Sequence, residues 1–161
     1  MNPISVENIQ ARWSELEQLS MEEQEILVSD MSAAQPDILV YLTDVGEELL
    51  DQEEKEVLLS FAVVVWFIMS KENTTAKQVE EISLDEIEQK NIELLEALEV
   101  EAEETLWDKL ELLLNEHNQS EIMNLIADEL LSSVDENLIK EERFLLLLFI
   151  LKTVVDALDE D

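Results

Sequence analysis

The chain has a single glycine, Gly46, and only two prolines among its 161 residues. Tight turns between β-strands depend on residues that tolerate positive φ angles, above all glycine. A chain so poor in glycine is badly suited to a sheet, whereas its long uninterrupted stretches of leucine and glutamate are typical of helices. The sequence therefore predicts an all-α fold.

Charge is the second constraint on folding. The sequence contains 41 acidic and nine basic residues, so its formal net charge is −32 at pH 7. Chains with this much charge stay disordered when few of their residues are apolar. Here 47% of the residues are hydrophobic, which is enough to build a core. We therefore expect a folded protein despite the repulsion between its like charges.

The distribution of charge excludes two classes of partner. Acidic residues outnumber basic ones by 12 in residues 1–71, by 12 in 72–118 and by 8 in 119–161, so no segment is basic. Nucleic acids and anionic membrane surfaces are bound through clustered lysine and arginine. We expect neither direct nucleic-acid binding nor membrane binding.

Helix signals divide the first half of the chain. Ser5 suits the N-cap of a first helix, and Ser20 opens a second helix with a capping-box pattern. Pro36 suits the first position of a third helix, for which Gly46 is the expected C-terminal cap. A fourth helix is predicted to begin near Gln52.

In the second half of the chain the helix-start patterns are further apart than in the first half. Residues 72–82 are polar and form the predicted linker, after which Ser83 begins another capping-box pattern. The apolar residues that follow recur every three to four positions as far as about Glu116. This stretch is compatible with one long helix or with two helices separated near residues 101–104. Two further helices, at about 120–131 and 140–158, bring the total to about six or seven.

Two segments are apolar on every face, namely residues 57–69 and 144–155. A helix of this kind is central in a core, at an interface or in a membrane. The first run is shorter than the roughly 20 residues needed to cross a bilayer. We expect the two runs to be the most buried helices and to contact each other. A buried β-strand, paired with residues 144–150, is the alternative for the first run.

Short stretches of the two halves resemble one another. Residues 35–39 align with 119–123 at an offset of 84, and residues 53–61 align with 141–149 at an offset of 88. This pattern predicts a helical bundle of two tandem related halves, residues 1–71 and 83–161, that share one core.

The sequence contains few of the residues that catalysis or cofactor binding requires. One glycine excludes a phosphate-binding loop and a dinucleotide fingerprint. The only histidine, His117, lies at a predicted helix end, where we expect a structural role as a cation next to the helix dipole. Trp13, Trp66 and Trp107 are expected to fill the core. No catalytic, cofactor-binding or metal-ligating residue is assigned, no cofactor is expected, and the protein is predicted not to be an enzyme.

The remaining hypothesis is a binding function. Acid-lined grooves between helices attract positive segments, and apolar stripes hold them. We therefore expect a protein interaction or adaptor module, monomeric or homodimeric, whose partner is basic or amphipathic. The absence of cysteine is consistent with a cytoplasmic location. One alternative is a nucleic-acid mimic that blocks a DNA-binding protein, and a second is a metal enzyme built on carboxylates.

Overall fold

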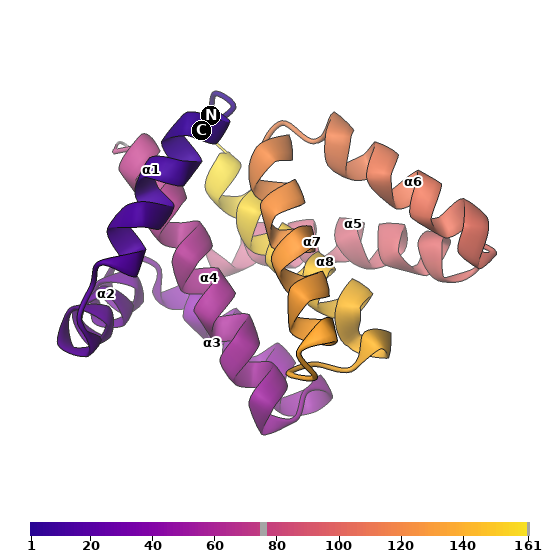
Figure 1. The fold of residues 1–161 in the computed structure, drawn as a ribbon, viewed down its shortest axis with the longest axis horizontal. Helices are drawn as coiled ribbons and strands as arrows, with labels where there is room; N and C mark the ends of the chain where they lie inside the picture. The colour runs from indigo at the N-terminus through magenta and orange to yellow at the C-terminus, as the bar shows by residue number, and fades with distance from the viewer. Residues whose placement is uncertain (75–76, 161) are drawn as a thin grey trace.

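The computed structural model describes residues 1–74 and 77–160, which fold into a bundle of helices with no strand among them (Figure 1). The predicted all-α class is confirmed, and the strand alternative for residues 57–69 is wrong. Within these described residues, eight α-helices and one short 3-10 helix follow one another. They are α1 (Val6–Glu17), α2 (Met21–Ala34), α3 (Pro36–Leu49), α4 (Gln52–Glu72), α5 (Glu81–Glu99), α6 (Glu103–Glu116), α7 (Ser120–Asp135), η1 (Glu141–Arg143) and α8 (Phe144–Asp159).

Local caps begin most helices of the first half as expected. The Ser5 hydroxyl accepts a hydrogen bond from the Asn8 amide at α1, and Ser20 forms a complete capping box at α2. Pro36 is the first residue of α3. Gly46 does not end α3, which continues one turn further to Leu49. The glycine is buried there, and a Cβ on it would lie 3.3 Å from Cγ of Lys55, so close packing explains this residue better than capping does.

The second half settles one open alternative and corrects one expectation. Residues 83–116 form two helices, α5 and α6, separated at residues 100–102, which resolves the alternative that the sequence left open. The helix α5 begins at Glu81, before the expected cap at Ser83. The amide of Glu81 instead donates a hydrogen bond to Oδ2 of Asp37 on α3, at 3.1 Å. A contact between distant segments therefore sets the start of α5.

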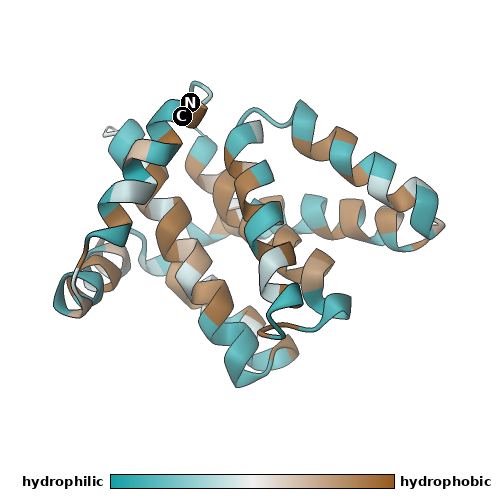
Figure 2. Cartoon of the chain, in the orientation of Figure 1, coloured by the Kyte–Doolittle hydropathy of each residue, from teal (hydrophilic) through white to brown (hydrophobic). Residues whose placement is uncertain are grey.

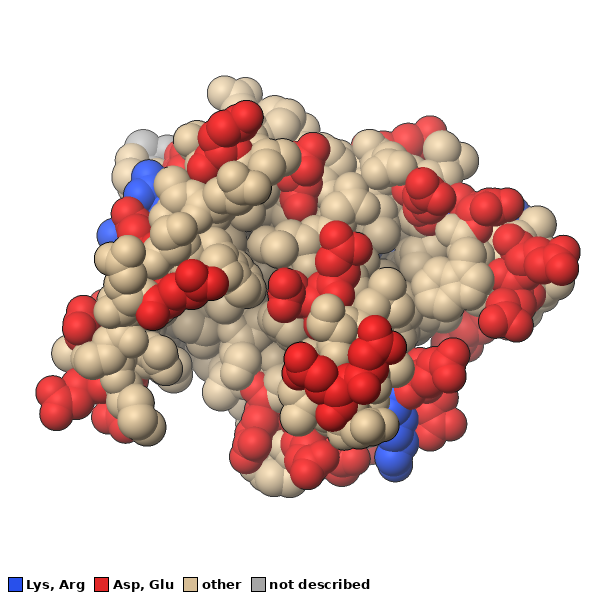
Figure 3. Space-filling view, viewed as in Figure 1, with Lys and Arg blue, Asp and Glu red and all other residues tan. Residues whose placement is uncertain are grey.

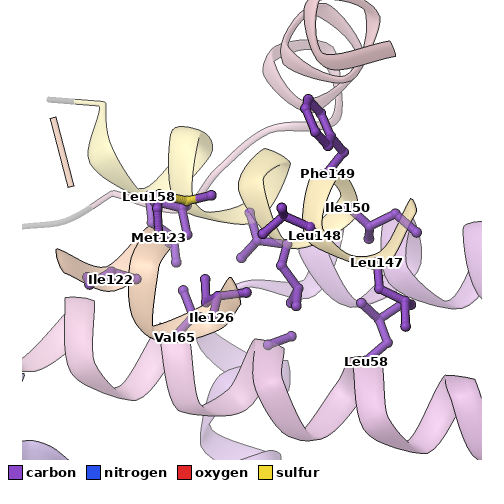
Figure 4. Close-up of a cluster of buried hydrophobic side chains, with 14 of the residues drawn as sticks. Leu58, Val65, Ile122, Met123, Ile126, Leu147, Leu148, Phe149, Ile150 and Leu158 are labelled. Carbon is purple, nitrogen blue, oxygen red and sulfur yellow. The ribbon is translucent and has the colours of Figure 1, made fainter. Parts of the chain in front are cut away.

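The helix α8 occupies the centre of the molecule. It packs against α4, α5 and α7, and twelve of its sixteen residues are buried. Figure 4 shows Leu147 and Leu148 directed from α8 toward Leu58 and Val65 of α4. The expectation that the runs 57–69 and 144–155 are buried and in contact is confirmed. Figure 2 shows hydrophobic residues, in brown, concentrated on α4 and α8 in the middle of the bundle, with hydrophilic residues, in teal, mostly toward its outside.

The tryptophans are less buried than predicted. Trp107 on α6 is 41% exposed, although its ring packs against Phe144 with a centroid distance of 5.7 Å. Trp13 and Trp66 are half-buried, and only Trp66 packs against the main core. The aliphatic residues of α8 already fill the centre of the bundle, which leaves the large indole rings at its periphery.

Acidic side chains are scattered over the visible surface in separate groups and do not form one continuous stripe (Figure 3). Lysine and arginine appear on that face in only a few places. No helix within the described residues is both long and apolar enough to span a membrane. The two ends of the chain lie together, because the terminal ammonium of Met1 donates a hydrogen bond to the carbonyl of Asp159 at 3.0 Å (Figure 1).

Candidate functional site

The candidate site is a groove between α3 and α5, which we call the α3/α5 groove. It consists of two adjoining cavities, an apolar one of about 220 Å³ and an acidic one of about 200 Å³. Both cavities are lined by Tyr41, Val45 and Glu48 of α3 and by Glu88 of α5, so they form one continuous depression. The helix α8 supplies the floor of the apolar cavity.

The apolar cavity is walled by aliphatic and aromatic side chains from three helices. Phe149 belongs to this wall, and Figure 4 shows its ring on the side of α8 opposite Leu58 and Val65. The face of α8 that does not meet α4 is thus used to build the groove. The other apolar residues of the wall are Val45, Leu49, Ile92, Leu95, Leu146 and Ile150.

The acidic cavity adjoins the apolar cavity on the side of the first residues of α3 and α5. Neither lysine nor arginine is found among the residues that line either cavity. At neutral pH the rim therefore presents negative charge without a neutralising partner. The six carboxylate side chains that line the acidic cavity are Asp37, Asp44, Glu48, Glu81, Asp85 and Glu88.

Glu88 and Tyr41 lie where the two cavities meet. Burial is the main cause that raises the pKa of Glu88 above its ordinary value, and the charges of Asp85 and Glu48 raise it further, although its hydrogen bond with Tyr41 opposes them. Burial also raises the pKa of Tyr41. The phenol therefore stays neutral at physiological pH. Burial and like charge raise the pKa of a carboxylate in this way when no nearby cation offsets them.

Three apolar side chains at the edge of the groove are partly exposed to solvent. Val40 is 57% exposed, Leu49 45% and Ile92 39%. Isolated exposed apolar residues are common on protein surfaces, but here Leu49 and Ile92 line the apolar cavity and Val40 lines the adjoining acidic one. Together with the cavity wall they form one apolar surface that water covers in the free protein.

A buried polar network holds α5 on α8 beneath the groove. Nδ2 of Asn91 donates to Oγ1 of Thr153 at 3.0 Å and to Oδ2 of Asp156 at 3.1 Å. Nζ of Lys152 donates to Oδ1 of Asn91 and to Oδ2 of Asp156, each at 2.8 Å. Asn91 and Thr153 also line the apolar cavity. These bonds satisfy a buried ammonium group and fix the floor of the groove relative to its wall.

His117 joins this network as a neutral ring. Its Nδ1 accepts a hydrogen bond from the Gln119 amide at 2.8 Å, so the proton is on Nε2, which lies 2.6 Å from Oδ1 of Asp156. The expected imidazolium at the end of α6 is therefore wrong. Burial raises the pKa of Asp156, but the hydrogen bond from His117 and the charge of Lys152 outweigh burial and lower the pKa below its ordinary value.

The sequence contains one local signal for this network, which the helix patterns above do not use. Lys152 lies within the apolar run 144–155, and Asp156 follows it by four residues. A lysine on an otherwise buried helix needs a partner, and a carboxylate one turn away is the nearest candidate. Asn91 could not have been found in this way, because it is 61 residues from Lys152.

Across residues 1–74 and 77–160, no three carboxylate or histidine side chains are grouped so that they could hold a metal ion. Comparison of the sequence with protein-family models, with curated proteins and with solved structures gave no match. The function of the α3/α5 groove must therefore be inferred from its own residues.

Proposed function

We propose that the protein is a non-catalytic binding module that holds a basic, amphipathic segment of another protein in the α3/α5 groove. The observation that carries this proposal is the combination of an apolar cavity with a rim of carboxylates and no basic residue. Neither feature alone specifies a partner. Side by side they select a segment with one apolar and one positively charged face.

The electrostatic part of the proposal follows from distance and screening. Charges within about 8 Å of one another interact appreciably at physiological ionic strength. Glu48, Asp85 and Glu88 surround one cavity, and the first two raise the pKa of the third through their charge. A lysine or arginine placed among them would relieve this repulsion. Complementary charge of this kind speeds association and selects the partner.

The apolar part supplies the stable contact. An amphipathic helix that covered Val40, Leu49 and Ile92 would remove exposed apolar surface from water. Helices bind in grooves in this manner, with anchors spaced three and four residues apart. The absence of cysteine supports a cytoplasmic location for the module as part of the same proposal.

A labelled basic amphipathic peptide tests the proposal by fluorescence anisotropy. Its affinity for the unmodified protein should be compared with that for a groove variant, Glu48→Gln with Asp85→Asn. The matched control is Glu104→Gln with Asp108→Asn, which removes one glutamate and one aspartate from exposed positions on α6. We expect the groove variant to bind about tenfold more weakly, because each lost charge pair contributes about 0.5–1 kcal/mol.

The control distinguishes a groove from general attraction. If both variants lost affinity equally, the whole acidic surface would attract the peptide and the groove would not be the site. Binding that is competed by a basic DNA-binding domain, and restored when duplex DNA is added, would favour nucleic-acid mimicry instead.

A further inference from the structure

We infer that the segment bound in the α3/α5 groove is an α-helix with one aromatic anchor side chain and a basic cluster one to two turns away from that anchor. This inference rests on the proposed function and specifies the partner more narrowly. It follows from the order of the two cavities along the groove and from the volume of the apolar one.

The helices α3 and α5 pass through the groove in the same direction. On α5, residues 81–88 line the acidic cavity and residues 88–95 line the apolar cavity. On α3, the acidic cavity begins at Asp37, whereas the apolar cavity begins at Tyr41 and ends at Leu49. The acidic lining therefore precedes the apolar lining on α5, whereas on α3 the two linings overlap, since Glu48 lines both cavities.

The separation of the two cavities determines the spacing between the anchor side chain and the basic residues of the bound helix. The linings are displaced by about seven residues on α5 and about three on α3, which corresponds to about 10 and 5 Å at 1.5 Å per residue. An α-helix covers 5–10 Å in about four to seven residues. A side chain in the apolar cavity would therefore be accompanied by basic residues about four to seven positions away on the same face.

The size of the apolar cavity indicates the anchor. Cavities of about 150 Å³ lined by leucine, isoleucine and phenylalanine accept benzene. The cavity here has a volume of about 220 Å³ and a wall of the same residue types, including Leu95, Leu146 and Phe149. A phenyl or indole ring would fill this space, whereas an alanine or valine would leave much of it empty. Aromatic side chains in fully desolvated pockets commonly dominate binding energy.

Helical peptides of about 18 residues provide the test, since that length is needed for helix formation in water. The reference peptide carries one phenylalanine and a lysine cluster four to seven residues away on the same face. A second peptide has alanine in place of the phenylalanine, and a third has the same composition with its lysines on the opposite face. The lysine cluster is placed on either side of the anchor, because the structure leaves the direction of the bound helix open.

A variant of the protein whose apolar cavity is filled tests the same anchor inference. Ile92→Trp places an indole in the apolar cavity, whereas Leu94→Trp makes the same change elsewhere on α5. Ile92 and Leu94 are 39% and 38% exposed, and only Ile92 lines the groove. Because both residues are partly exposed, the fold should tolerate both changes, and circular dichroism checks this directly.

We expect the alanine peptide to bind at least about 30-fold more weakly than the reference peptide. We expect about tenfold weaker binding when the lysines are moved to the opposite face or when Ile92→Trp fills the cavity, and no change with Leu94→Trp. If all peptides bound equally and still responded to the Glu48 and Asp85 variant, the anchor inference would be wrong and the proposed function would stand. If none bound at millimolar concentration, the proposed function itself would fail.

Discussion

Gln35 and Gln119 make the same pair of hydrogen bonds at equivalent places in the fold. Each is the N-cap of its helix, Gln35 for α3 and Gln119 for α7. Oε1 of Gln35 accepts from the Val79 amide at 2.8 Å, and Oε1 of Gln119 accepts from the Ile4 amide at 3.0 Å. In each case Nε2 donates to the carbonyl two residues earlier in the bound segment, at 3.2 Å for Lys77 and 2.9 Å for Asn2.

This relationship supports the predicted division of the chain into two related halves, which stays a prediction. Both glutamines hold the extended residues that precede a long amphipathic helix, α5 in one case and α1 in the other. Gln119 bonds to the start of the first half, whereas Gln35 bonds to the predicted linker that leads into the second half. Together with Asp37, Gln35 also determines where α5 begins, and therefore the position of one wall of the α3/α5 groove.

Replacing either glutamine by alanine should destabilise the protein. Gln35→Ala leaves a buried amide and a carbonyl without partners, which should lower the free energy of unfolding by about 2–4 kcal/mol. Gln119→Ala should have a similar effect, measured by urea denaturation. Gln78→Ala is the control, because Gln78 is exposed. A loss for Gln35→Ala no larger than that of the control would show that the hydrogen bonds do not stabilise the fold.

Truncation of the central helix should be more costly than truncation at the surface. Leu148 is fully buried on α8, so Leu148→Ala should lower the free energy of unfolding by about 2–5 kcal/mol through lost contacts and a new cavity. Leu112→Ala on α6, where the side chain is 57% exposed, should change it by no more than about 0.5 kcal/mol. Equal effects in urea denaturation would contradict the central position of α8.

The Asp156 network should contribute stability that depends on pH. The pKa of Asp156 is lower in the folded state than the ordinary value of about 3.9, so its contribution is present above that value and is lost as pH falls through the folded pKa. Asp156→Asn should therefore destabilise the protein by about 1–3 kcal/mol at pH 7, with a smaller difference below pH ~4. A difference that stayed constant down to pH ~2 would contradict this assignment.

Glu88 should titrate above the ordinary glutamate pKa of about 4.3, because burial and the neighbouring charges raise its pKa. Carbon-13 NMR of the side-chain carboxyl measures this directly. The variant Glu48→Gln with Asp85→Asn should lower the Glu88 pKa, and a bound basic peptide should do the same. By linkage, peptide affinity should fall as pH is lowered through the Glu88 pKa. A Glu88 pKa at or below the ordinary value would contradict the electrostatic description of the groove.

Salt should stabilise the whole fold. The net charge of −32 makes repulsion between carboxylates a general cost of folding. Raising sodium chloride from about 0.01 to 0.15 M shortens the screening length from about 30 to 8 Å, so the midpoint of urea denaturation should rise. Urea is required because guanidinium is itself a salt. A midpoint that fell over this range would mean that attractive charge pairs outweigh the repulsion.

The sequence by itself determined the helices whose signals are local. Ser5, Ser20 and Pro36 begin their helices as predicted, since a cap interacts with residues only two or three positions away. The runs 57–69 and 144–155 were identified as the contacting core because a helix that is apolar on all faces has to be buried. The proposal of a basic partner also rests on the sequence, since net charge is a property of composition.

Tertiary structure alone decided the features that depend on distant residues. The start of α5 is set by Asp37, which is 44 residues from Glu81, and the local signal at Ser83 is overridden. Trp107 does not lie in the core as expected but is 41% exposed, because α8 fills the centre with aliphatic side chains. The α3/α5 groove and the Asn91 network join helices that are far apart along the chain. No local pattern specifies such pairings, because they arise from the packing of completed helices against one another.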